Sequence, residues 1–559
     1  MNPTTKNLLK IDSSYNRDML MRDVIAGLTI VVLLVPQAMA YAMLAGLPPV
    51  MGLYASTIPL IIYALFASSK HLAVGPTAIT SLLVFSGVSA FAEAETSQYI
   101  AIALVLALMV GMIQLLMGVF KLGFIVQYIS GAVINAYTSA AAFIIGLSQL
   151  GHLLGIELEN HLQLHHLMYD VITSFGDLNV ITAAIGMGSI ISLILVKKYM
   201  PRIPSALFIV VVTIAVVFAF GFEAEGVDIV GAVPSGLPEL GVPEITFDTV
   251  QMLIPTAFLV ALMGFMESLA IGKTIADREN YTLDANQELK SLGLANMSSA
   301  FVQAYPVNAS LSRSAINHQA GAVSQVASLV TAAFIILTLL FFTSYFYYLP
   351  QAALAAIIMV AISKLVDFRT LKYLWKVKRT DGINWLVTFF VTLFLGIQWG
   401  FFLGALFSFA IIINRSTKPN IVELGLLGQE GNFYDRNRFP EAKTFENTVI
   451  ARVDASLHFA NISMLKNAVN KMINDRQDVK FMVIDLAGVN DIDVGSIKVL
   501  KEMVESLAAD RGITLYFTNM KGPVRDVVER AESEDGTIHS SMYRTIEQAL
   551  EAHGVSERQ

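Results

Sequence analysis

The feature that most constrains this chain is a series of long apolar segments between residues 24 and 413. A helix needs about 20 consecutive apolar residues to cross the hydrocarbon core of a bilayer, and about fourteen segments near that length follow one another here, two of them short. Lipid cannot satisfy exposed backbone N–H and C=O groups, so such segments are expected to be helical. The sequence therefore predicts an α-helical, multi-pass membrane protein.

The overall composition argues against several other classes of protein. Hydrophobic residues make up 55% of the 559 residues, charged residues make up 14%, and the formal net charge is -7. This balance leaves no basic surface for nucleic acid, which is not expected as a partner. The absence of cysteine rules out thiolate metal ligands and thiol nucleophiles. No glycine-rich loop ends in Lys-Ser or Lys-Thr, so the chain lacks this nucleotide-binding motif, and transport driven by ATP would require another subunit. The sequence does not predict an enzyme.

The charges between the apolar segments predict the topology. Cytoplasmic loops carry an excess of Lys and Arg, so the basic gaps are assigned to the inside and the acidic gaps, such as 93–96 and 221–248, to the outside. Residues 1–22 and the C-terminal end are then cytoplasmic in a protein of the cell membrane. The basic residues that mark the inside are Arg17, Arg22, Lys70, Lys121, Lys197, Lys198 and Arg202.

Proline and hydroxyl residues interrupt two segments at membrane depth. The first interruption covers 72–81 and includes Gly75 and Pro76, and the second covers 304–313. Because proline fits the first helical turn, the first predicts a half-helix that begins at Pro76, with its free N–H groups facing Gly75. Each interruption falls in the third helix of its half, which indicates a seven-plus-seven inverted repeat. An anion site is predicted where the two positive helix ends meet.

Two ionisable residues lie in the membrane region. Arg313 is predicted about two turns into the second half-helix, either as a fixed cation facing an anion or as a charge that snorkels to the inner face. Glu267 lies near the inner end of a predicted helix over 250–271. Either Glu267 couples transport to protons, by offsetting the charge of the anion when protonated, or it pairs with Lys273 or Arg278 at the cytoplasmic rim.

The chain beyond Arg415 is polar and indicates a separate soluble domain. Apolar runs at 449–453, 481–486 and 515–517 predict strands, and 495–508 predicts a helix, which together favour an α/β fold. The predicted domains are an N-terminal cytoplasmic segment over 1–22, a transmembrane domain over 23–415, a linker over 416–444 and the α/β domain over 445–555.

Several short motifs carry a resemblance to a known family. The membrane region contains PQAMAYA at 36–42, AGLPP at 45–49, GLYAS at 52–56 and AVGP at 73–76. Further along are PSGLP at 234–238, NQEL at 286–289, GLAN at 293–296 and SLSRS at 310–314, and the soluble domain has LHFAN at 457–461 and Ile492-Asp493. Together these motifs resemble the SulP sulfate permease family, which includes pendrin and prestin, with its C-terminal STAS domain.

The resemblance implies a fold and a set of site residues. The fold is an inverted repeat of core and gate subdomains that holds an anion between the third and tenth helices, with elevator-like movement of the core and a homodimeric assembly. Position by position, the resemblance places Glu267 of the eighth helix, the candidate coupling residue, in the site. The implied substrate-binding residues are Gln37, Tyr41, Thr77, Ala78, Ser310, Ser312 and Arg313.

Two places depart from the pattern of the family. Phosphorylated STAS domains and their relatives commonly carry Asp-Ser/Thr-Ser-Gly, whereas here Asp493 is followed by Val494, Gly495 and Ser496. Phosphorylation at the usual position, now Gly495, is not expected, and Ser496 is a shifted candidate. Asn308 lies near the start of the tenth helix, where family members differ, and is a candidate for tuning the substrate or the coupling ion.

Two other side-chain clusters are interpreted as structural. One comprises three histidines of the outer loop, whose spacing could hold a metal on a helix but which no carboxylate or thiol completes, so no metal site is predicted. The other, in the soluble domain, lies in a strand-like segment without the sharp turn that presents the nucleophile of a hydrolase, so it is not interpreted as a hydrolase site. The two clusters are His161, His165 and His166, and Asp454, Ser456 and His458.

The predicted function is secondary active transport of a small anion, with the proton as the leading coupling ion and no other cofactor. Backbone amides, hydroxyls and one Arg suit sulfate, which is favoured, and suit bicarbonate or a dicarboxylate nearly as well. Sodium coupling is the nearest alternative. An anion channel and an anion sensor that signals through the STAS domain are alternatives of other classes. Membrane lipid and a cytoplasmic protein at the STAS domain are the further partners considered.

Overall fold

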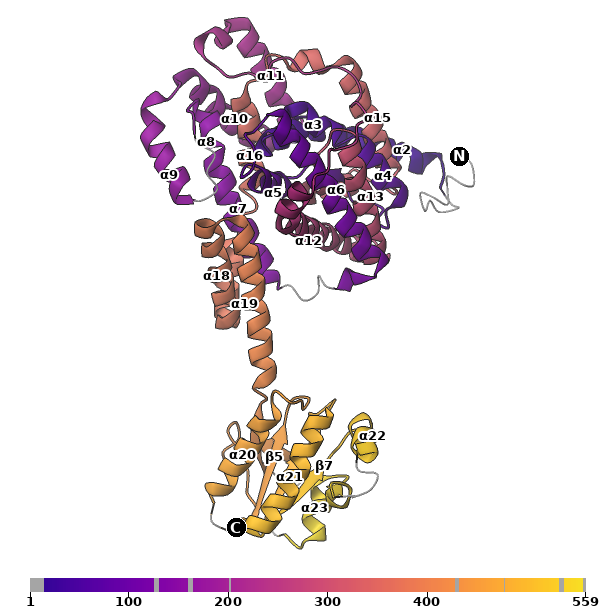
Figure 1. Cartoon of the computed structure of the whole chain (residues 1–559), viewed down its shortest axis with the longest axis vertical. Coiled ribbons are helices and arrows are strands. Elements are labelled where there is room, and N and C mark those ends of the chain that lie inside the picture. The colour runs from indigo at the N-terminus through magenta and orange to yellow at the C-terminus, as the bar shows by residue number, and fades with distance from the viewer. Residues whose placement is uncertain are drawn as a thin grey trace. The chain divides into compact units, whose positions relative to one another are not determined.

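The computed structural model describes residues 15–124, 130–158, 164–200, 203–427, 432–476, 478–531 and 537–555. The chain divides into two compact units, Met1–Ser408 and Phe409–Gln559. Figure 1 shows helices packed together in the first unit and a sheet with helices in the second. The expected combination of a helical membrane domain and a C-terminal α/β domain is confirmed, while the predicted domain limits stay predictions.

The first unit is built almost entirely from helices. Seven described helical segments are long and apolar enough to cross a membrane, and four shorter apolar helices accompany them. The helices of its first half are α2 (Arg17–Leu44), α3 (Pro49–Tyr54), α4 (Ile58–Phe66), α5 (Ala78–Val88), α6 (Ser97–Val119), α7 (Gly131–Ser148), α8 (Leu150–Leu154), α9 (Leu164–Thr173), α10 (Val180–Tyr199) and α11 (Ser205–Phe220). Those of the second half are α12 (Phe247–Arg278), α13 (Ala285–Phe301), α14 (Leu311–Gln319), α15 (Val326–Phe341), α16 (Gln351–Ile362), α17 (Phe368–Val377), α18 (Arg379–Leu395) and α19 (Ile397–Thr417), the last of which crosses the boundary between the units.

The two halves of the first unit interleave rather than stand apart. Helix α13 packs against α4 and α6, α15 packs against α2, and α18 packs against α7. Small residues allow the closest of these approaches: a Cβ at Gly111 of α6 would lie 2.4 Å from the backbone nitrogen of Met297, and one at Gly293 of α13 would lie 2.6 Å from that of Leu115. Close packing of this kind holds helices together where lipid provides no hydrophobic drive.

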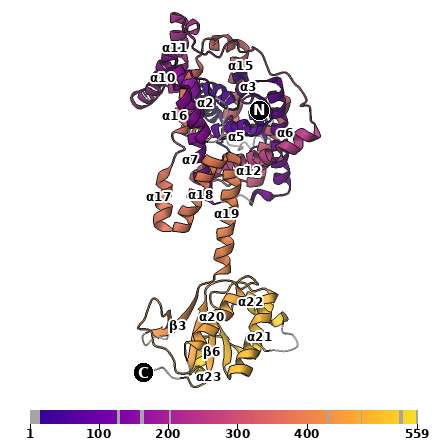
Figure 2. The ribbon, with the colours of Figure 1, turned by 60° about the vertical axis from the view of Figure 1, so that its left-hand side comes forward.

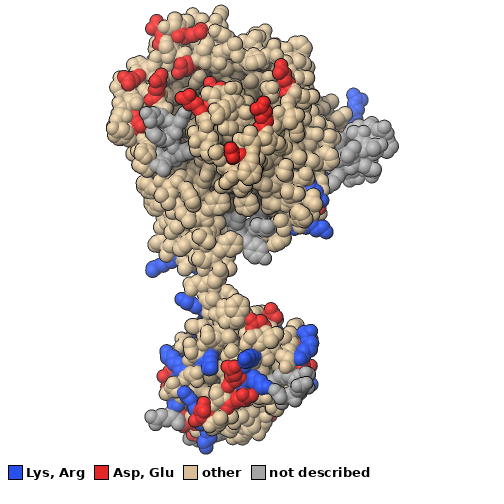
Figure 3. Space-filling model, viewed as in Figure 1, with Lys and Arg blue, Asp and Glu red and all other residues tan. Residues whose placement is uncertain are grey.

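Charged side chains are unevenly distributed over the first unit. In Figure 3 its Asp and Glu residues gather over the upper and left part of the visible face, whereas its visible Lys and Arg residues lie along the right-hand and lower margins. Most of the surface between them carries neither sign. This separation agrees with the alternation of basic and acidic gaps along the sequence and supports the predicted topology.

Two fully buried carboxylates accept hydrogen bonds from residues in the other half of the first unit. Asp23 accepts hydrogen bonds from the backbone nitrogens of Val323 at 2.7 Å and Ser324 at 3.1 Å. Glu288 accepts from the Tyr63 hydroxyl at 2.8 Å and from the backbone of Ser69 at 2.6 Å. The second set fixes the loop between α4 and the short strand that leads into α5, and it therefore positions the candidate site.

The second unit contains a six-stranded sheet in the order β4-β3-β5-β6-β7-β8. Strands β5 to β8 pair in parallel, and β3 pairs antiparallel with β4 and β5. Its strands are β3 (Ile421–Leu427), β4 (Asn432–Asp435), β5 (Thr448–Val453), β6 (Phe481–Asp485), β7 (Thr514–Thr518) and β8 (Met542–Tyr543). Its helices are α20 (Ile462–Asn474), α21 (Val494–Arg511), α22 (Gly522–Ala531) and α23 (Ile546–Ala552), and Figure 2 shows them around the sheet.

The predicted strands correspond to β5, β6 and β7, and the predicted helix lies within α21. Three strands of the second unit were not foreseen: β3, β4 and β8. Strands β3 and β4 occupy part of the range predicted as linker, and β8 has only two residues. Strands β3 and β4 form the antiparallel side of an otherwise parallel sheet.

Candidate functional site

Two short strands meet at the centre of the first unit. Strand β1 (Val74–Gly75) pairs antiparallel with β2 (Asn308–Ala309), so that Val74 lies opposite Ala309 and Gly75 opposite Asn308. The pair is extended by a bond from the Ser310 nitrogen to the Ala73 carbonyl at 3.1 Å. Helix α5 begins three residues after β1, and α14 begins two residues after β2. The pairing therefore brings the N-terminal ends of both half-helices to one place.

The predicted starting points of the half-helices were wrong by a few residues. Helix α5 begins at Ala78 rather than Pro76, because Thr77 has extended dihedral angles and caps the helix: its Oγ1 accepts from the Thr80 nitrogen at 3.4 Å. Pro76 occupies the connection between strand and helix, to which its fixed φ is equally suited. Arg313 is correspondingly in the first turn of α14, not two turns inside it. Arg313 therefore belongs to the turn whose backbone N–H groups have no acceptor within the helix.

Arg313 is the most unusual side chain of the site. It is 1% exposed, and none of its three guanidinium nitrogens has a hydrogen-bond partner among the residues that the structure describes. A Cβ placed on Gly75 would lie 3.5 Å from Nη2 of Arg313, so the absence of a side chain at Gly75 leaves the guanidinium next to the β1 backbone. Burial of an unpaired charge is costly, by several kcal/mol as a rule, unless an opposite charge joins it.

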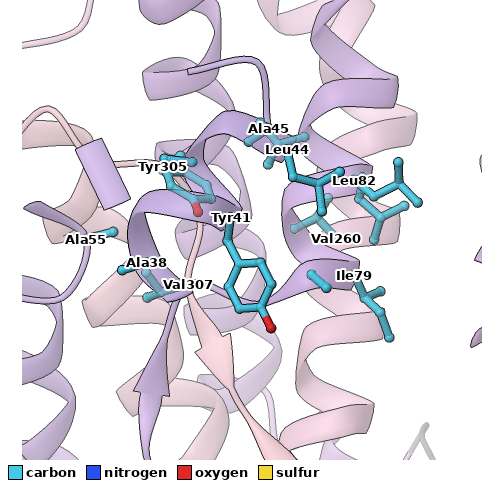
Figure 4. Packing of buried hydrophobic residues seen from close by; sticks show 14 of the residues in the cluster. Ala38, Tyr41, Leu44, Ala45, Ala55, Ile79, Leu82, Val260, Tyr305 and Val307 are labelled. Carbon is cyan, nitrogen blue, oxygen red and sulfur yellow. The ribbon is translucent and has the colours of Figure 1, made fainter. Parts of the chain in front are cut away.

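Three polar groups from other elements surround this guanidinium. Arg313 interacts electrostatically with Tyr41 of α2, with Tyr305 in the segment before β2, and with Glu267 of α12. The Tyr305 hydroxyl lies 3.1 Å from Oγ of Ser81. Tyr41 packs within the central apolar cluster, which Figure 4 shows together with residues of α5, α12 and the segment before β2. Both tyrosines thus lie within electrostatic range of the guanidinium.

Asn308, the departure from the family pattern, bridges β2, α5 and α12. Its Nδ2 donates to Oγ1 of Thr80 at 2.7 Å, and the Thr77 hydroxyl donates to the same oxygen at 3.0 Å. The amide fits against Gly264 of α12, where a Cβ would lie 2.0 Å from Nδ2. The neighbouring Ala309 nitrogen donates to Oγ of Ser268 at 3.1 Å. These contacts give Asn308 a role in joining the elements that carry the site.

A buried chain of amides that sequence reasoning missed supports the segment before β2. The Val307 nitrogen donates to Oδ1 of Asn296 at 2.6 Å, and Nδ2 of Asn296 donates to Oε1 of Gln114 at 2.8 Å. Nε2 of Gln114 then donates to the Ala261 carbonyl at 3.1 Å. The only sequence signal was the presence of two amide side chains in apolar segments, where polar groups require partners.

The structure brings together some of the predicted site residues and separates others. Thr77 and Ala78 are buried at the start of α5, close to the half-helix junction that also holds Arg313. Ser310 and Ser312 lie with their hydroxyls 3.3 Å apart, and Ser312 is exposed, at the open side of the junction. Gln37 lies on α2, four residues before Tyr41, and its Oε1 is buried without a partner. Both orphaned groups, on Gln37 and Arg313, are suited to a polar ligand.

Glu267 lies on α12 and is only partly buried. The positively charged group with which it interacts is Arg313 of α14, in the same half of the chain. Within the described part of the chain, Glu267 forms no ion pair with Lys273 or Arg278. The structure therefore does not support the reading of Glu267 as a rim carboxylate paired with its own helix.

The clusters interpreted as structural take part in other contacts. On α9, the exposed His165 and His166 have ring centroids 4.2 Å apart and ring planes tilted by 40°, while His161 lies outside the described residues. In the second unit, Arg452 donates to Asp454 at 2.6 Å, and Nε2 of His458 lies 2.9 Å from Oγ of Ser416. The Ser456 carbonyl accepts from Asn461 at 2.9 Å.

Ser496, the shifted candidate for phosphorylation, is fully buried in the first turn of α21. A kinase requires an accessible hydroxyl, so the structure contradicts this candidate. At the usual position a Cβ on Gly495 would meet only Oδ1 of Asp493 at 3.6 Å and Cβ of Phe459 at 3.9 Å. The usual position is therefore open but lacks the hydroxyl.

Comparisons with known proteins agree over most of the chain. Residues 20–388 match the model of the sulfate permease family, and residues 439–549 match that of the STAS domain. The chain is 36% identical to the chloroplastic sulfate transporter 4.1 of Arabidopsis thaliana, over 91% of the chain and 76% of that protein. It is 30% identical to a probable sulfate transporter of Mycobacterium tuberculosis, over 96% of each. The structure of the murine Solute Carrier 26 family member A9 anion transporter in the inward-facing state superposes with a TM-score of 0.90, at 25% identity, and covers 99% of this chain and 95% of that one.

Proposed function

Since the chain belongs to the sulfate permease family, we propose that it carries a small oxyanion across the membrane by secondary active transport, with sulfate favoured. The observation that supports this most strongly is Arg313, a buried guanidinium without a partner at the junction of two half-helix N-termini. Both the guanidinium and the N-terminal ends of the helices attract an anion. Two of the relatives compared are named sulfate transporters.

The site has the chemistry for a tetrahedral or planar oxyanion. A guanidinium presents a planar fork of donors that matches two oxygens at once, and a hydroxyl such as that of Ser310 adds a single donor. Sulfate carries two charges, so it gains most from the guanidinium and the helix ends together. Bicarbonate and dicarboxylates also present two oxygens that fit this guanidinium, so they are the competing substrates in the uptake experiment.

Proton coupling is the second part of the proposal. Glu267 is held within electrostatic reach of Arg313, so an ionised carboxylate competes with the anion for the same positive charge. Protonation removes this competition and favours anion binding, which links the two fluxes. Sodium is the alternative ion, and backbone carbonyls beside the half-helices would hold it.

Movement of the site is proposed to follow the elevator mode. Strands β1 and β2 and helices α5, α12 and α14 are joined by backbone pairing and by the bonds of Asn308 and Ala309. Elements joined in this way are suited to move as one rigid body against the remaining helices. A homodimeric assembly and a cytoplasmic partner at the STAS domain belong to the same proposal.

Uptake into proteoliposomes tests the function. Labelled sulfate, bicarbonate and a dicarboxylate are offered under an imposed pH gradient without sodium, and under a sodium gradient at fixed pH. We expect saturable sulfate accumulation with the inside alkaline, and we expect Glu267→Gln to remove its pH dependence. Accumulation only with sodium would replace the proton by the alternative ion. Large unsaturable currents would indicate a channel, and binding without flux a sensor.

The proposed orientation places both the N-terminus and the STAS domain in the cytoplasm. Because the chain has no cysteine, a single cysteine introduced at Lys70 or at Glu95 reports its own side without a background. An impermeant maleimide added to whole cells is expected to label Glu95→Cys but not Lys70→Cys. The reverse pattern would invert the topology.

A further inference from the structure

Helix α17 differs from the other helices of the first unit because it combines a basic stripe with exposed aromatic residues. Arg369, Lys372 and Lys376 are spaced i, i+3 and i+7, so they share one face of the helix, and all three are exposed. Leu371 and Leu374, on another face, are half-buried and pack against the core of the unit. The helix is therefore anchored by its leucines and presents its cations outward.

Aromatic side chains flank the basic stripe. Phe368 is 42% exposed, Trp375 is 45% exposed and Tyr373 is 66% exposed. Aromatic residues in such positions are typical of the boundary between lipid tails and headgroups, where an apolar ring and a polar edge are both satisfied. A basic amphipathic helix with aromatic residues on its borders lies in the plane of that boundary. The basic residues place α17 at the cytoplasmic leaflet.

A surface groove of about 440 Å³ opens beside the basic stripe. The groove lies between α17 and α18 and is lined by Leu371, Trp375 and Leu386, with Lys372 and Lys376 completing the lining. A Cβ on Gly382, at the start of α18, would lie 2.8 Å from Cε3 of Trp375. Gly382 therefore allows the indole to rest on α18 and to form one wall of the groove.

We propose that this groove binds an anionic phospholipid of the cytoplasmic leaflet, with the headgroup phosphate between Lys372 and Lys376 and an acyl chain against Trp375, Leu371 and Leu386. The lining of the groove is almost entirely apolar, so Lys372 and Lys376 border it with their aliphatic stems and supply positive charge next to it. This arrangement matches a molecule that is anionic at one end and apolar along its length. A soluble anion uses only the ammonium groups and leaves the apolar surface exposed to water. A zwitterionic lipid fills the groove but brings its own positive charge close to the lysines.

Binding of a lipid here would join α17 to α18 across the groove. Since α18 packs against α7, the lipid would also stabilise this group of helices against the movement of neighbouring elements. The proposal goes beyond the proposed transport function, and the binding measurement below does not depend on any transported substrate. A negative result for lipid binding would therefore leave the transport proposal standing, and a negative result for uptake would leave the lipid proposal standing.

Quenching of tryptophan fluorescence by brominated lipids tests the proposal on the full-length protein. The chain has three tryptophans, of which Trp385 is fully buried and Trp399 is 61% exposed. In a Trp399→Phe background the accessible indole is Trp375. We expect brominated phosphatidylglycerol to quench it at a mole fraction about 10-fold lower than brominated phosphatidylcholine requires. Lys372→Gln with Lys376→Gln is expected to abolish this preference.

A matched control removes the same charge elsewhere. Lys197→Gln with Lys198→Gln alters two lysines at the end of α10 and is expected to leave the lipid preference unchanged. Equal quenching by the two lipids, or a preference that survives the loss of Lys372 and Lys376, would overturn the proposal. Loss of the preference on addition of millimolar inorganic phosphate, but not of chloride at the same ionic strength, would assign the lysines to a soluble anion and would overturn it as well.

Discussion

Nδ2 of Asn308 donates a hydrogen bond to Oγ1 of Thr80 at 2.7 Å, although the two residues lie 228 positions apart in the chain. Asn308 belongs to β2, which leads into α14, and Thr80 lies in the first turn of α5. The bond therefore joins the beginnings of the two half-helices in addition to the backbone pairing of their strands. It fixes the spacing of the two positive helix ends, and hence the size of the gap that an anion would occupy.

Removal of this acceptor is the first test of the junction. Thr80→Val keeps the shape of the side chain but leaves Nδ2 of Asn308 buried without a partner. We expect a loss of about 1–3 kcal/mol, which is the usual cost of an unsatisfied buried donor, seen as a lower apparent unfolding midpoint in detergent. Thr80→Ser retains the hydroxyl and should unfold much closer to wild type. Equal midpoints for the valine and serine variants would show that the bond contributes nothing.

Gly264, against which the Asn308 amide packs, provides an independent test of the same region. A Cβ there would lie 2.0 Å from Nδ2 of Asn308, so Gly264→Ala must push the amide out of its place. Overpacking of this kind usually costs about 1–3 kcal/mol, and we expect slower uptake as well as a lower unfolding midpoint. Gly188→Ala on α10 is the control, since a Cβ there meets nothing within 4 Å and alanine favours the helix. A Gly264→Ala protein as stable and active as Gly188→Ala would contradict the described fit.

Arg313 is expected to determine anion affinity. Arg313→Lys keeps the charge but loses the planar fork, and we expect KM for sulfate to rise by about 10-fold or more. Arg313→Gln removes the charge and should abolish saturable uptake, while the folded protein elutes normally on size exclusion. Lys273→Gln, which removes an exposed charge from the rim of α12, serves as the control and should transport as wild type does. A wild-type KM for Arg313→Lys would exclude bidentate contact with the anion.

The second unit offers a pH-dependent prediction. Arg452 donates to both carboxylate oxygens of Asp454, at 2.6 and 3.2 Å, and these bonds lower the pKa of Asp454, with a further contribution from Asn420. Because the folded-state pKa lies below the unfolded value, ionised Asp454 stabilises the fold above about pH 3.9, and this stabilisation is lost as the pH falls through the folded-state pKa. At pH 7 we expect Asp454→Asn to destabilise the unit by about 0.5–1 kcal/mol.

Hydrogen–deuterium exchange of β5 peptides in the full-length protein measures this effect. Protection in wild type and Asp454→Asn should differ at pH 7 and converge as the pH falls below about 4, after correction for intrinsic exchange. Asp475→Asn removes an exposed charge from the end of α20 and is the control. A difference that persists unchanged at the lowest pH would mean that the ion pair is not its cause.

Much of the architecture could be predicted because it depends on local composition. The apolar segments indicated the helices, the alternation of charged gaps indicated the topology, and the short apolar runs indicated strands β5 to β7 of the second unit. Each of these signals comes from residues that are close together in the sequence. The starts of α5 and α14 were misplaced by two or more residues, because the cap at Thr77 and the strand pairing of Gly75 outweigh the preference of proline for a first turn.

The sequence by itself determined that two proline-interrupted segments lie at membrane depth, and that Arg313 and Glu267 are the ionisable groups near them. Only the tertiary structure decided that these segments pair as strands, that Arg313 is buried without a partner, and that Glu267 interacts with it rather than with Lys273 or Arg278. The physical reason is that burial and hydrogen-bond satisfaction are properties of neighbours in space. For β1 with β2, and for Tyr41 with Arg313, those neighbours come from opposite halves of the chain, and no local pattern of residues specifies them.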